Sequence, residues 1–494
     1  MTDSISARGR FFRAPFGVPR STLLFALALI ALYAAILAVK FGLWRNNVLY
    51  SDWTFFNNIL WNTDFRELWL YSHLAEQQYG FASYLNEHFS PILLALAPLY
   101  QIAPWPEHLL LALHGAAPVL AAIGIRATAV RLLGGRALAA VIGLAFAFNP
   151  AILQPAINSI YGFHTDCFLP PIAALAGWAL AARRQGLYFF ALLLALTVKE
   201  NVPAYGVILG LCLIAFTARR AQGLWTVAIS SAAFLLASKG VPWITGLESR
   251  NIGFVWKFLD DVLHLRATLD YTPSELIHAA RYGLAFLPAL FVLPFLAMLG
   301  PDILLIGQVS HATTSSWHIM LPVTVLGIAS VYGTARFQAL ASSGALAGVD
   351  RLIPRARLIR LYWGAAMAAA LIAGPADLWI KYGRWSAHGV QVDRVAVAAA
   401  LELVPPAAGV VATNDIAQFF AHRKYLRSSL RKGEAVFGYL ATNRHAVTLL
   451  RHHANDKCLI AMAEQLARRD GALLLDRGGI LLVRLPAKAE LECP

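Results

Sequence analysis

Apolar runs separated by short polar gaps make up most of this chain. The first run, residues 21–44, is about as long as a bilayer-crossing helix and lacks the polar, small-residue end of a cleavable signal, so it predicts a retained anchor. Ten more runs predict further spans, several shorter than the roughly 20 residues of a standard span. Such short spans are sheltered by neighbours, broken, or partly interfacial. The eleven predicted spans are 21–44, 107–125, 137–150, 166–182, 187–199, 203–218, 222–238, 283–299, 302–314, 317–335 and 359–380.

One further apolar stretch, residues 89–102, is too short for a span and contains Pro91 and Pro98. Proline inside a helix removes a hydrogen bond and bends the chain. The pattern therefore predicts a re-entrant or interfacial helix that closes the first external loop.

The gaps between the runs alternate between arginine-rich and acid-rich composition. The positive-inside rule assigns the arginine-rich gaps to the cytoplasm and the others to the external side. On this rule the N-terminus is cytoplasmic, and the long segments 45–106 and 239–281 are external loops. The arginines that set this pattern are Arg8, Arg10, Arg13, Arg20, Arg126, Arg131, Arg136, Arg183, Arg184, Arg219, Arg220, Arg336, Arg351, Arg355, Arg357 and Arg360.

Composition supports a membrane protein and argues against a nucleic-acid partner. Of 494 residues, 58% are hydrophobic and only 14% charged, against about 25% charged in soluble proteins. The formal net charge of +14 would suggest nucleic acid if the basic residues formed one soluble face. They are instead distributed among the gaps, so the charge reflects membrane topology.

The last part of the chain, residues 381–494, has a different pattern. "GVVAT" has strand character, "NDIAQFFAHR" begins with Asn414 and Asp415 as candidate helix caps, and "GALLLDRGGILLVRL" predicts two strands joined at "DRGG". These features predict a small external α/β domain of roughly 110 residues. Cys458 and Cys493 both lie in it, and a disulfide between them is left open. The predicted organisation is a cytoplasmic N-terminus (1–20), a polytopic α-helical membrane domain (21–380) and this domain.

Five short polar stretches fall at or near the external ends of the predicted helices. Ionisable residues within membranes are expensive and therefore functional by default, although residues at helix ends reach water at little cost. Each stretch also has a structural reading: a capping acid, a solvated loop pair, or a histidine and carboxylate that lock a helix end. The stretches hold Asp52; Glu87 and His88; His164 and Asp166; Lys199 and Glu200; and His318.

Two inferences follow from residue types alone. Lys199 and Glu200 are adjacent and point in different directions on a helix, so Lys199 is expected to face an anion. A mixture of histidine and carboxylate can hold a divalent metal, with Glu87, His88 and His164 as candidates, but no paired CxxC or HExxH spacing is present. Metal binding is therefore left open. The chain contains neither a GxxxxGK[ST] motif nor a Gly-rich dinucleotide fingerprint after a strand, so nothing in it indicates a bound nucleotide.

The ordered motifs "SDWTFFNNILWN", "NEHFSPIL", "GFHTDCFLPP" and "TVKEN", followed by His318 before a long helix, resemble a bacterial family of uncharacterised multi-pass membrane proteins. Members of that family look like GT-C glycosyltransferases. The resemblance covers most of the chain, from the first helix to the C-terminal domain. It implies a GT-C-like membrane fold and a polyprenyl-phosphate-linked sugar as the donor.

GT-C enzymes hold an acidic residue in the first external loop, near the end of the first helix, and Asp52 matches that position. Many of them carry paired acids there, whereas this sequence has Ser51 before Asp52 and offers its next acids at Asp64 and Glu87. Whether a second acid such as Glu87 takes part stays open. The chain has no WWD motif, so the resemblance does not extend to en bloc transfer to asparagine.

The resemblance implies an inverting transfer in which one carboxylate, Asp52, removes the proton of an acceptor hydroxyl. Lys199, aided by Arg250 or Arg281, would neutralise the departing phosphate, and His88 and His164 would orient the donor or a metal. An apolar belt between helices would hold the polyprenyl tail. The sugar stays open, as does the acceptor (a glycan, a lipid or a protein). Asp166, Glu200 and His318 complete the expected substrate-binding set.

Two other readings fit parts of the sequence. A transporter or lipid flippase would account for many spans with ionisable residues, but it predicts charges deep within helices and inverted repeats, which this sequence does not show. A membrane-anchored binding or scaffold protein would account for the C-terminal domain and leave the five polar stretches unexplained. The external glycosyltransferase is the reading that uses both.

Overall fold

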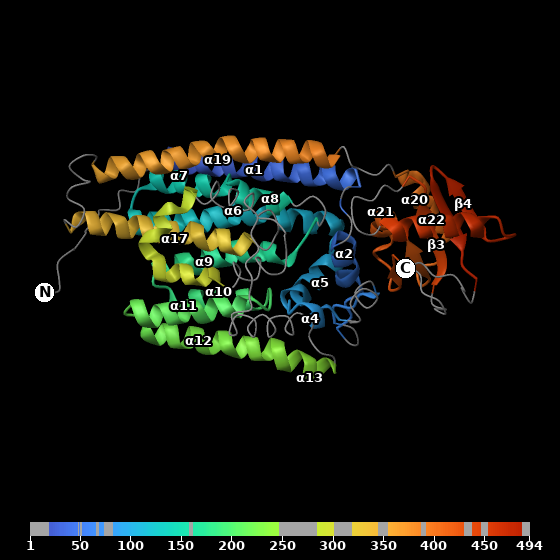
Figure 1. Cartoon of the computed structure of the whole chain (residues 1–494), viewed down its shortest axis with the longest axis horizontal. Helices are drawn as coiled ribbons and strands as arrows, with labels where there is room; N and C mark the ends of the chain where they lie inside the picture. Colours follow the sequence, from blue (N-terminus) through green and yellow to red (C-terminus); the bar gives the residue numbers. More distant parts are fainter. Residues whose placement is uncertain are drawn as a thin grey trace.

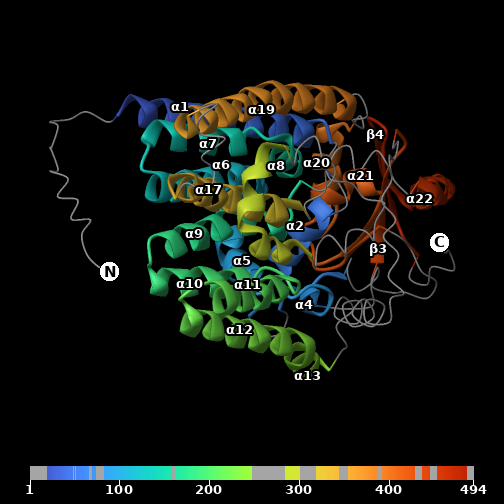
Figure 2. The same cartoon turned by 60° about the vertical axis from the view of Figure 1, so that its left-hand side comes forward.

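The computed structural model describes a helical bundle with a small α/β domain at one end (Figure 1). The first helix of the bundle starts at the end remote from this domain, and the last helix leads into it. Figure 2 shows the same arrangement from a second side, with the domain again beyond one end of the helices. The described residues are 19–47, 49, 52–65, 69–73, 83–157, 162–246, 284–300, 319–343, 354–386, 392–428, 437–445 and 453–486.

The helices of the bundle follow the apolar runs of the sequence. Most begin or end within a few residues of the predicted spans, because the polar gaps supply the chain reversals. They are α1 (Arg20–Arg45), α6 (Pro106–Leu133), α7 (Arg136–Ala147), α8 (Pro150–Ile157), η1 (Thr165–Phe168), α9 (Leu169–Ala181), α10 (Gln185–Leu196), α11 (Val202–Phe216), α12 (Arg220–Leu235), η2 (Leu236–Gly240), α13 (Val241–Thr245), η3 (Leu284–Leu299), α17 (Met320–Ser342) and α19 (Arg355–Ser386).

Five of the described helices are long and apolar enough to cross a membrane on their own, and a bent pair brings the number to six. Others in the bundle, such as α10 and α11, are apolar but have only 12 and 15 residues. The predicted number of eleven spans is therefore not confirmed. The predicted span 302–314 lies outside the described residues.

The bent pair is α7 followed by α8, which meet at 50°. Residues that precede a proline disfavour the helical conformation, and Asn149 precedes Pro150 at the break. The Asn149 side chain accepts a hydrogen bond from the Ala151 N–H at 2.9 Å and so starts the new helix. The prediction of one short span over 137–150 missed α8 because the proline separates the two segments.

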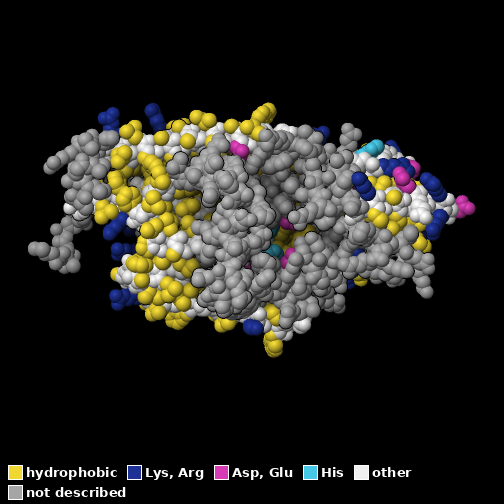
Figure 3. All heavy atoms as spheres, in the orientation of Figure 1, with side chains coloured by type: hydrophobic (Ala, Val, Ile, Leu, Met, Phe, Trp, Pro, Cys, Tyr) yellow, Lys and Arg dark blue, Asp and Glu magenta, His cyan; other side chains and the backbone are white. Residues whose placement is uncertain are grey.

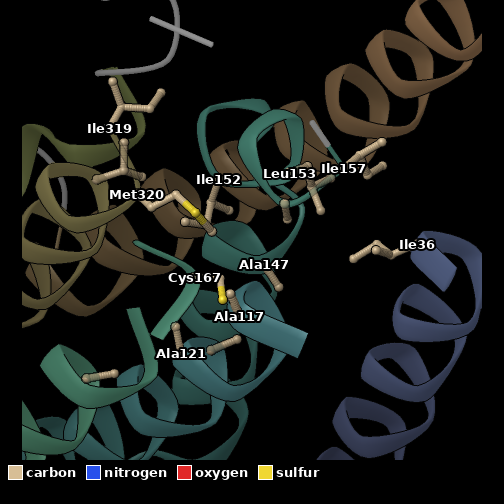
Figure 4. Packing of buried hydrophobic residues seen from close by; sticks show 14 of the residues in the cluster. Ile36, Ala117, Ala121, Ala147, Ile152, Leu153, Ile157, Cys167, Ile319 and Met320 are labelled. Atoms are coloured by element: carbon tan, nitrogen blue, oxygen red, sulfur yellow. The ribbon is translucent and has the colours of Figure 1, made fainter. Parts of the chain in front are cut away.

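Small residues allow the central helices to pack closely. Figure 4 shows Ala117 and Ala121 of α6 and Ala147 of α7 in one buried cluster with Ile36 of α1 and Ile152 of α8. Since lipid tails are as apolar as leucine, membrane helices associate through such close van der Waals contact. On the outside, hydrophobic side chains cover much of the bundle in Figure 3, with lysine and arginine at the end remote from the α/β domain.

Three short helices, here called the short-helix layer, lie at the end of the bundle that faces the α/β domain (Figure 1). They are α2 (Asp52–Asn62), α4 (Tyr84–Glu87) and α5 (Ile92–Ile102). The 11-residue α5 agrees with the short helix predicted over 89–102, and Pro98 lies inside it. This layer carries the first two of the polar stretches that the sequence singles out.

The C-terminal α/β domain contains a five-stranded sheet of order β2-β1-β3-β5-β4. β1 pairs in parallel with β2 and β3, whereas β3 with β5 and β5 with β4 are antiparallel. Buried residues of α20 pack on one face of the sheet and those of α22 on the other. The strands are β1 (Gly409–Ala412), β2 (Leu426–Arg427), β3 (Phe437–Asn443), β4 (Leu473–Arg477) and β5 (Ile480–Arg484), and the helices are α20 (Arg394–Leu403), α21 (Asn414–Ala417) and α22 (His453–Ala467).

The β4–β5 hairpin lies where the sequence predicts it. Gly478 and Gly479 form its turn with φ of +57° and +81°, the left-handed values that a two-residue turn of this kind requires. The helix predicted after β1 also forms, but its N-cap is Thr413 without a side-chain cap, and Asp456 accepts from the Asn414 N–H instead. Cys458 is disulfide-bonded, and Cys493 lies outside the described residues.

The α/β domain contacts the short-helix layer through residues 421–425, here called the docking loop. Asn58 of α2 donates to the carbonyl oxygens of Ala421 at 2.8 Å and Arg423 at 2.9 Å. The His422 ring stacks on Trp61 with 4.3 Å between ring centroids. The helix that begins at Asp52 is thus bonded directly to the C-terminal domain.

Candidate functional site

The site is built around the first residue of α2. Asp52 starts this helix and is half-buried, while Trp53 and Phe56 anchor it to the bundle with about 1% of their surface exposed. A carboxylate in the first turn interacts favourably with the positive end of the helix dipole. The structural reading of Asp52 as a helix-terminal acid therefore holds alongside any chemical role.

Tyr84 packs against residues of two polar stretches: its ring centroid lies 5.6 Å from that of Phe56 in α2 and 5.4 Å from that of His88. Tyr84 starts α4 and is 2% exposed. Burial raises the pKa of Tyr84 well above its ordinary value, and the carboxylates of Glu87, Glu200, Asp52 and Asp166 raise it further. Residues from three separate polar stretches and from α4 itself thus act on one phenol.

Glu200 joins the second and fourth polar stretches. Its Oε1 lies 2.8 Å from His88 Nδ1, and its Oε2 accepts from the Phe89 N–H at 3.0 Å. Burial favours the neutral carboxyl, but His88 outweighs it and holds the pKa of Glu200 below its ordinary value. Ser90 also donates to the Val198 carbonyl at 2.7 Å, so the segment before α5 is bonded to the segment before α11.

A second chain of contacts links His164, Asp166 and Lys199. Asp166 Oδ2 lies 2.6 Å from His164 Nδ1 and 3.0 Å from Lys199 Nζ. All three side chains are at least 95% buried. The anion that Lys199 was expected to face is thus Asp166 of the same chain, and the adjacent Glu200 turns toward His88, as the reading of Lys199 and Glu200 as separate groups predicts.

Acidic groups outnumber basic ones at the site. The acids are Asp52, Glu87, Asp166 and Glu200, and the basic groups are Lys199, His88 and His164. Acceptor hydroxyls can donate to carboxylate oxygens, and a carboxylate can remove a proton. Within the described ranges, no group of three or more His, Cys, Asp or Glu residues is arranged to hold a metal ion. Glu87 lies in α4, His88 is directed to Glu200 and His164 to Asp166, so the three metal candidates are not brought together as one ligand set.

Three of the expected residues cannot be placed. Arg250, Arg281 and His318 lie outside the described residues. Sequence reasoning also missed residues that the structure brings to the site. Tyr84 carries no signal beyond its place in the first external loop, whereas Lys40 had one, because a lysine inside an apolar run requires a partner.

An apolar cavity of about 340 Å³ lies within the helix bundle. Val202, which lines it, follows Glu200 by two positions, and Leu321 lines it from α17. The cavity extends between α9, α10 and α11 to Thr217 and Arg219 at the other end of α11. Its volume lies within the range of small-molecule sites, and its lining is almost entirely hydrophobic.

Comparison with known sequences decides the family. Residues 49–471 match the family described as "Predicted membrane protein (DUF2079)". The chain belongs to the DUF2079 family. This confirms the resemblance to an uncharacterised family of multi-pass membrane proteins. None of the curated proteins matches this chain.

The DUF2079 protein is similar in fold to ArnT from Cupriavidus metallidurans. The crystal structure of ArnT bound to undecaprenyl phosphate has 15% sequence identity and a TM-score of 0.51, covering 96% of this chain and 99% of that one. The apo structure of the same protein has 14% identity and a TM-score of 0.49, covering 96% and 100%. The first match supports the GT-C-like fold that the sequence resemblance implies.

Proposed function

We propose that this DUF2079 protein is a GT-C-type glycosyltransferase that uses a polyprenyl-phosphate-linked sugar at the external face of a bacterial inner membrane. The observation that carries the proposal is the buried cluster in which Glu200 contacts His88 and Asp166 contacts both His164 and Lys199, in a bundle that also holds an apolar cavity. A transferase of this class needs a base for the acceptor and an apolar site for the lipid, and the bundle offers a candidate for each. ArnT has been crystallised with undecaprenyl phosphate bound, which supports the donor class.

Asp52 is the proposed base. It would take the proton of an acceptor hydroxyl while that oxygen attacks the anomeric carbon of the sugar. The bond between the anomeric carbon and the phosphate oxygen breaks, and its electron pair leaves with the polyprenyl phosphate. The anomeric configuration is inverted, because attack and departure occur on opposite faces. Glu87 is the second candidate base, and Asp166 and Glu200 would hold the acceptor through their hydrogen-bonded oxygens.

The leaving phosphate needs positive charge more than it needs a proton. Lys199 can supply part of it, but its ammonium is already bound to Asp166, so phosphate would approach an ion pair and not a free cation. His88 adds positive charge when it is protonated. Arg250 and Arg281 of the second long loop are the further cations proposed for this role.

The cavity between α9, α10 and α11 is the proposed site for part of the polyprenyl tail. Because the tail already lies in an apolar bilayer, the cavity would hold it through close van der Waals contact and not through removal of apolar surface from water. The polar residues would then discriminate the head group. In this proposal the phosphate lies near Lys199 and the reacting sugar carbon toward Asp52.

The experiment that tests the proposal uses the full chain in proteoliposomes. Undecaprenyl phosphate should raise the unfolding temperature in a saturable way, whereas undecaprenol, which lacks the phosphate, should bind at least 10-fold more weakly. Polyprenyl-phosphate hexoses labelled in the sugar should then lose label to an acceptor in envelope extracts. Equal binding of the alcohol and the phosphate, together with no transfer of any labelled sugar, would overturn the proposal.

A further inference from the structure

Lys40 is a completely buried lysine that the proposed reaction does not use. It lies on α1, inside the first predicted span, and its side chain is 0% exposed. Its Nζ is 2.7 Å from the Gly162 carbonyl oxygen, 2.8 Å from His114 Nδ1 and 3.1 Å from the Ala156 carbonyl oxygen. One ammonium thus connects α1, α6, the end of α8 and the segment that leads to His164.

The hydrogens of Lys40 are all used by these contacts. An ammonium has three N–H groups, and three acceptors lie within 3.1 Å, with the Ile157 carbonyl as a fourth at 3.5 Å. Carbonyls at the C-terminal end of a helix have no partner in the helix itself and attract positive charge. In a dry bundle such groups must be satisfied by the protein. Lys40 therefore directs its hydrogens to groups of the protein, which fits a structural role.

The carbonyls that Lys40 holds lie on both sides of residues 158–161. Ala156 and Ile157 end α8, and Gly162 starts the stretch that carries His164 and Asp166. Gly162 has φ of +60°, and a Cβ atom there would lie 2.7 Å from Cε3 of Trp53, the neighbour of Asp52. The segment that begins at Gly162, which Lys40 holds, thus lies directly against the start of α2.

Two aromatic contacts continue this link between the segment and α2. Phe163 meets Phe56 of α2 edge-on, with 5.2 Å between ring centroids, and His164 meets the same ring at 5.6 Å. A shift of Gly162 along the bundle would therefore displace His164 and Asp166 relative to Asp52. Displacements of about 1 Å in such sites can cost about 100-fold in rate.

We propose that Lys40 is a positioning residue: it fixes the segment Gly162–Asp166 against α2 and so sets the distance between the His164–Asp166–Lys199 chain and Asp52. The inference rests on the proposed transferase function for its effect on rate. The anchoring itself does not depend on that function.

The test compares the full-length parent with Lys40→Met, which keeps the length and apolar stem of the side chain and removes every donor. Amide hydrogen exchange over residues 157–168 should speed up at least 10-fold in Lys40→Met at a temperature where both proteins are folded. Lys239→Met, at an exposed lysine in η2, is the matched control and should exchange like the parent. Unchanged exchange in Lys40→Met would overturn the anchoring.

The kinetic arm separates positioning from a purely stabilising role. In donor-saturated transfer assays corrected for the folded fraction, Lys40→Met should lose at least 10-fold in kcat, with a smaller change in the KM for the lipid donor. Lys40→Arg, which keeps a cation with several N–H donors, should recover part of the loss. A lower Tm with the parent's kcat per folded molecule would show that Lys40 only stabilises the bundle.

If Lys40→Met does not fold, Lys40→Gln provides a graded comparison, because its shorter side chain keeps two N–H donors and should speed exchange by less. Faster exchange confined to 157–168 would support the proposal, and a uniform change over the bundle would contradict it. The hydrogen-exchange experiment also tests the anchoring by Lys40 separately from the transferase proposal. If the parent transfers no sugar under any condition, the transferase proposal fails, while local exchange still decides whether Lys40 anchors Gly162.

Discussion

Lys199 and Asp166 form a buried ion pair in which Nζ lies 3.0 Å from Oδ2 and 3.3 Å from Oδ1. Asp166 is also in contact with His164, so this carboxylate is held from two sides. A cation bound in this way is preorganised, since it does not have to leave water when a phosphate arrives. The same burial means that neither partner can be removed without leaving a charge in a dry environment.

Replacing Lys199 should therefore affect folding as well as donor binding. We expect Lys199→Met to lower the free energy of unfolding by about 3–5 kcal/mol, because the charge of Asp166 is left buried without its ammonium. The Asp166→Asn/Lys199→Met double variant should be destabilised by less than the sum of the single variants. Thermal unfolding in detergent measures both. Arg444→Met, at an exposed pair with Asp476, is the control and should cost under about 1 kcal/mol.

The His88–Glu200 contact predicts a pH window of stability. Burial opposes the charged imidazole, but Glu200 outweighs it and raises the pKa of His88 above 6.5, with Glu87 adding to the rise and Lys199 opposing it. The contribution of His88 is thus complete below pH 6.5 and is lost as the pH rises through the raised value. The pKa of Glu200 is lowered from 4.5, so its contribution is complete above pH 4.5 and is lost as the pH falls further.

Between pH 4.5 and 6.5 the pair should be most stabilising. We expect Glu200→Gln to cost about 1.5–3 kcal/mol in that window and less above it, measured as unfolding free energy against pH. Glu464→Gln, on the half-exposed contact with Arg444, is the comparison and should change little over the same range. A cost of Glu200→Gln that grows with pH above 6.5 would contradict the assigned charge pair.

The docking loop should couple the C-terminal domain to α2. Asn58→Ala removes donors to the carbonyls of Ala421 and Arg423 and should destabilise the contact by about 1–3 kcal/mol. Hydrogen exchange should rise over residues 419–428 and at the start of α2. Asn62→Ala, which removes one longer bond to Arg423, is the graded control with a smaller effect. Equal protection in Asn58→Ala and the parent would show that the domain is held by other contacts.

The orientation of the chain is a separate prediction. Reporter fusions after Arg220 and after Arg357 should be cytoplasmic, and fusions near Asn251 and after Lys381 should be external. The described arginines at the turns between helices, such as Arg183 and Arg184, lie at the end of the bundle away from Asp52. An external reporter at Arg357 would reverse the placement of the C-terminal domain.

Much of the helical layout could be predicted from the sequence, because apolar runs and polar gaps determine where membrane helices start and stop. The same reasoning placed Asp52, Glu87 and Glu200 at one end of the bundle. It could not give the pairings, since Lys199, in the turn between α10 and α11, is 33 positions from Asp166 in η1 and meets it only in the folded chain. Tyr84 was missed for the same reason: its importance lies in its neighbours in space.

In the C-terminal domain, too, local features could be predicted from the sequence and long-range pairings could not. The β4–β5 hairpin follows from the local Gly478–Gly479 signal, whereas β2 and β3 were not predicted, because parallel pairing is a long-range choice. The expected caps at Asn414 and Asp415 illustrate the limit of local rules. Thr413 takes the N-cap position, and the Asn414 N–H is satisfied by Asp456, 42 positions later.

The transfer rate of Asp52→Asn tests most directly whether Asp52 is the catalytic base. Asparagine has nearly the size of aspartate and caps helices about as well, so it keeps any structural role and removes the base. Asp64→Asn, at an exposed acid just beyond the other end of α2, is the matched control. We expect Asp52→Asn to fold and bind undecaprenyl phosphate like the parent but to transfer sugar about 100-fold more slowly or worse, while Asp64→Asn transfers normally. Full transfer activity in a well-folded Asp52→Asn protein would contradict this role of Asp52 and make Glu87 the next candidate base.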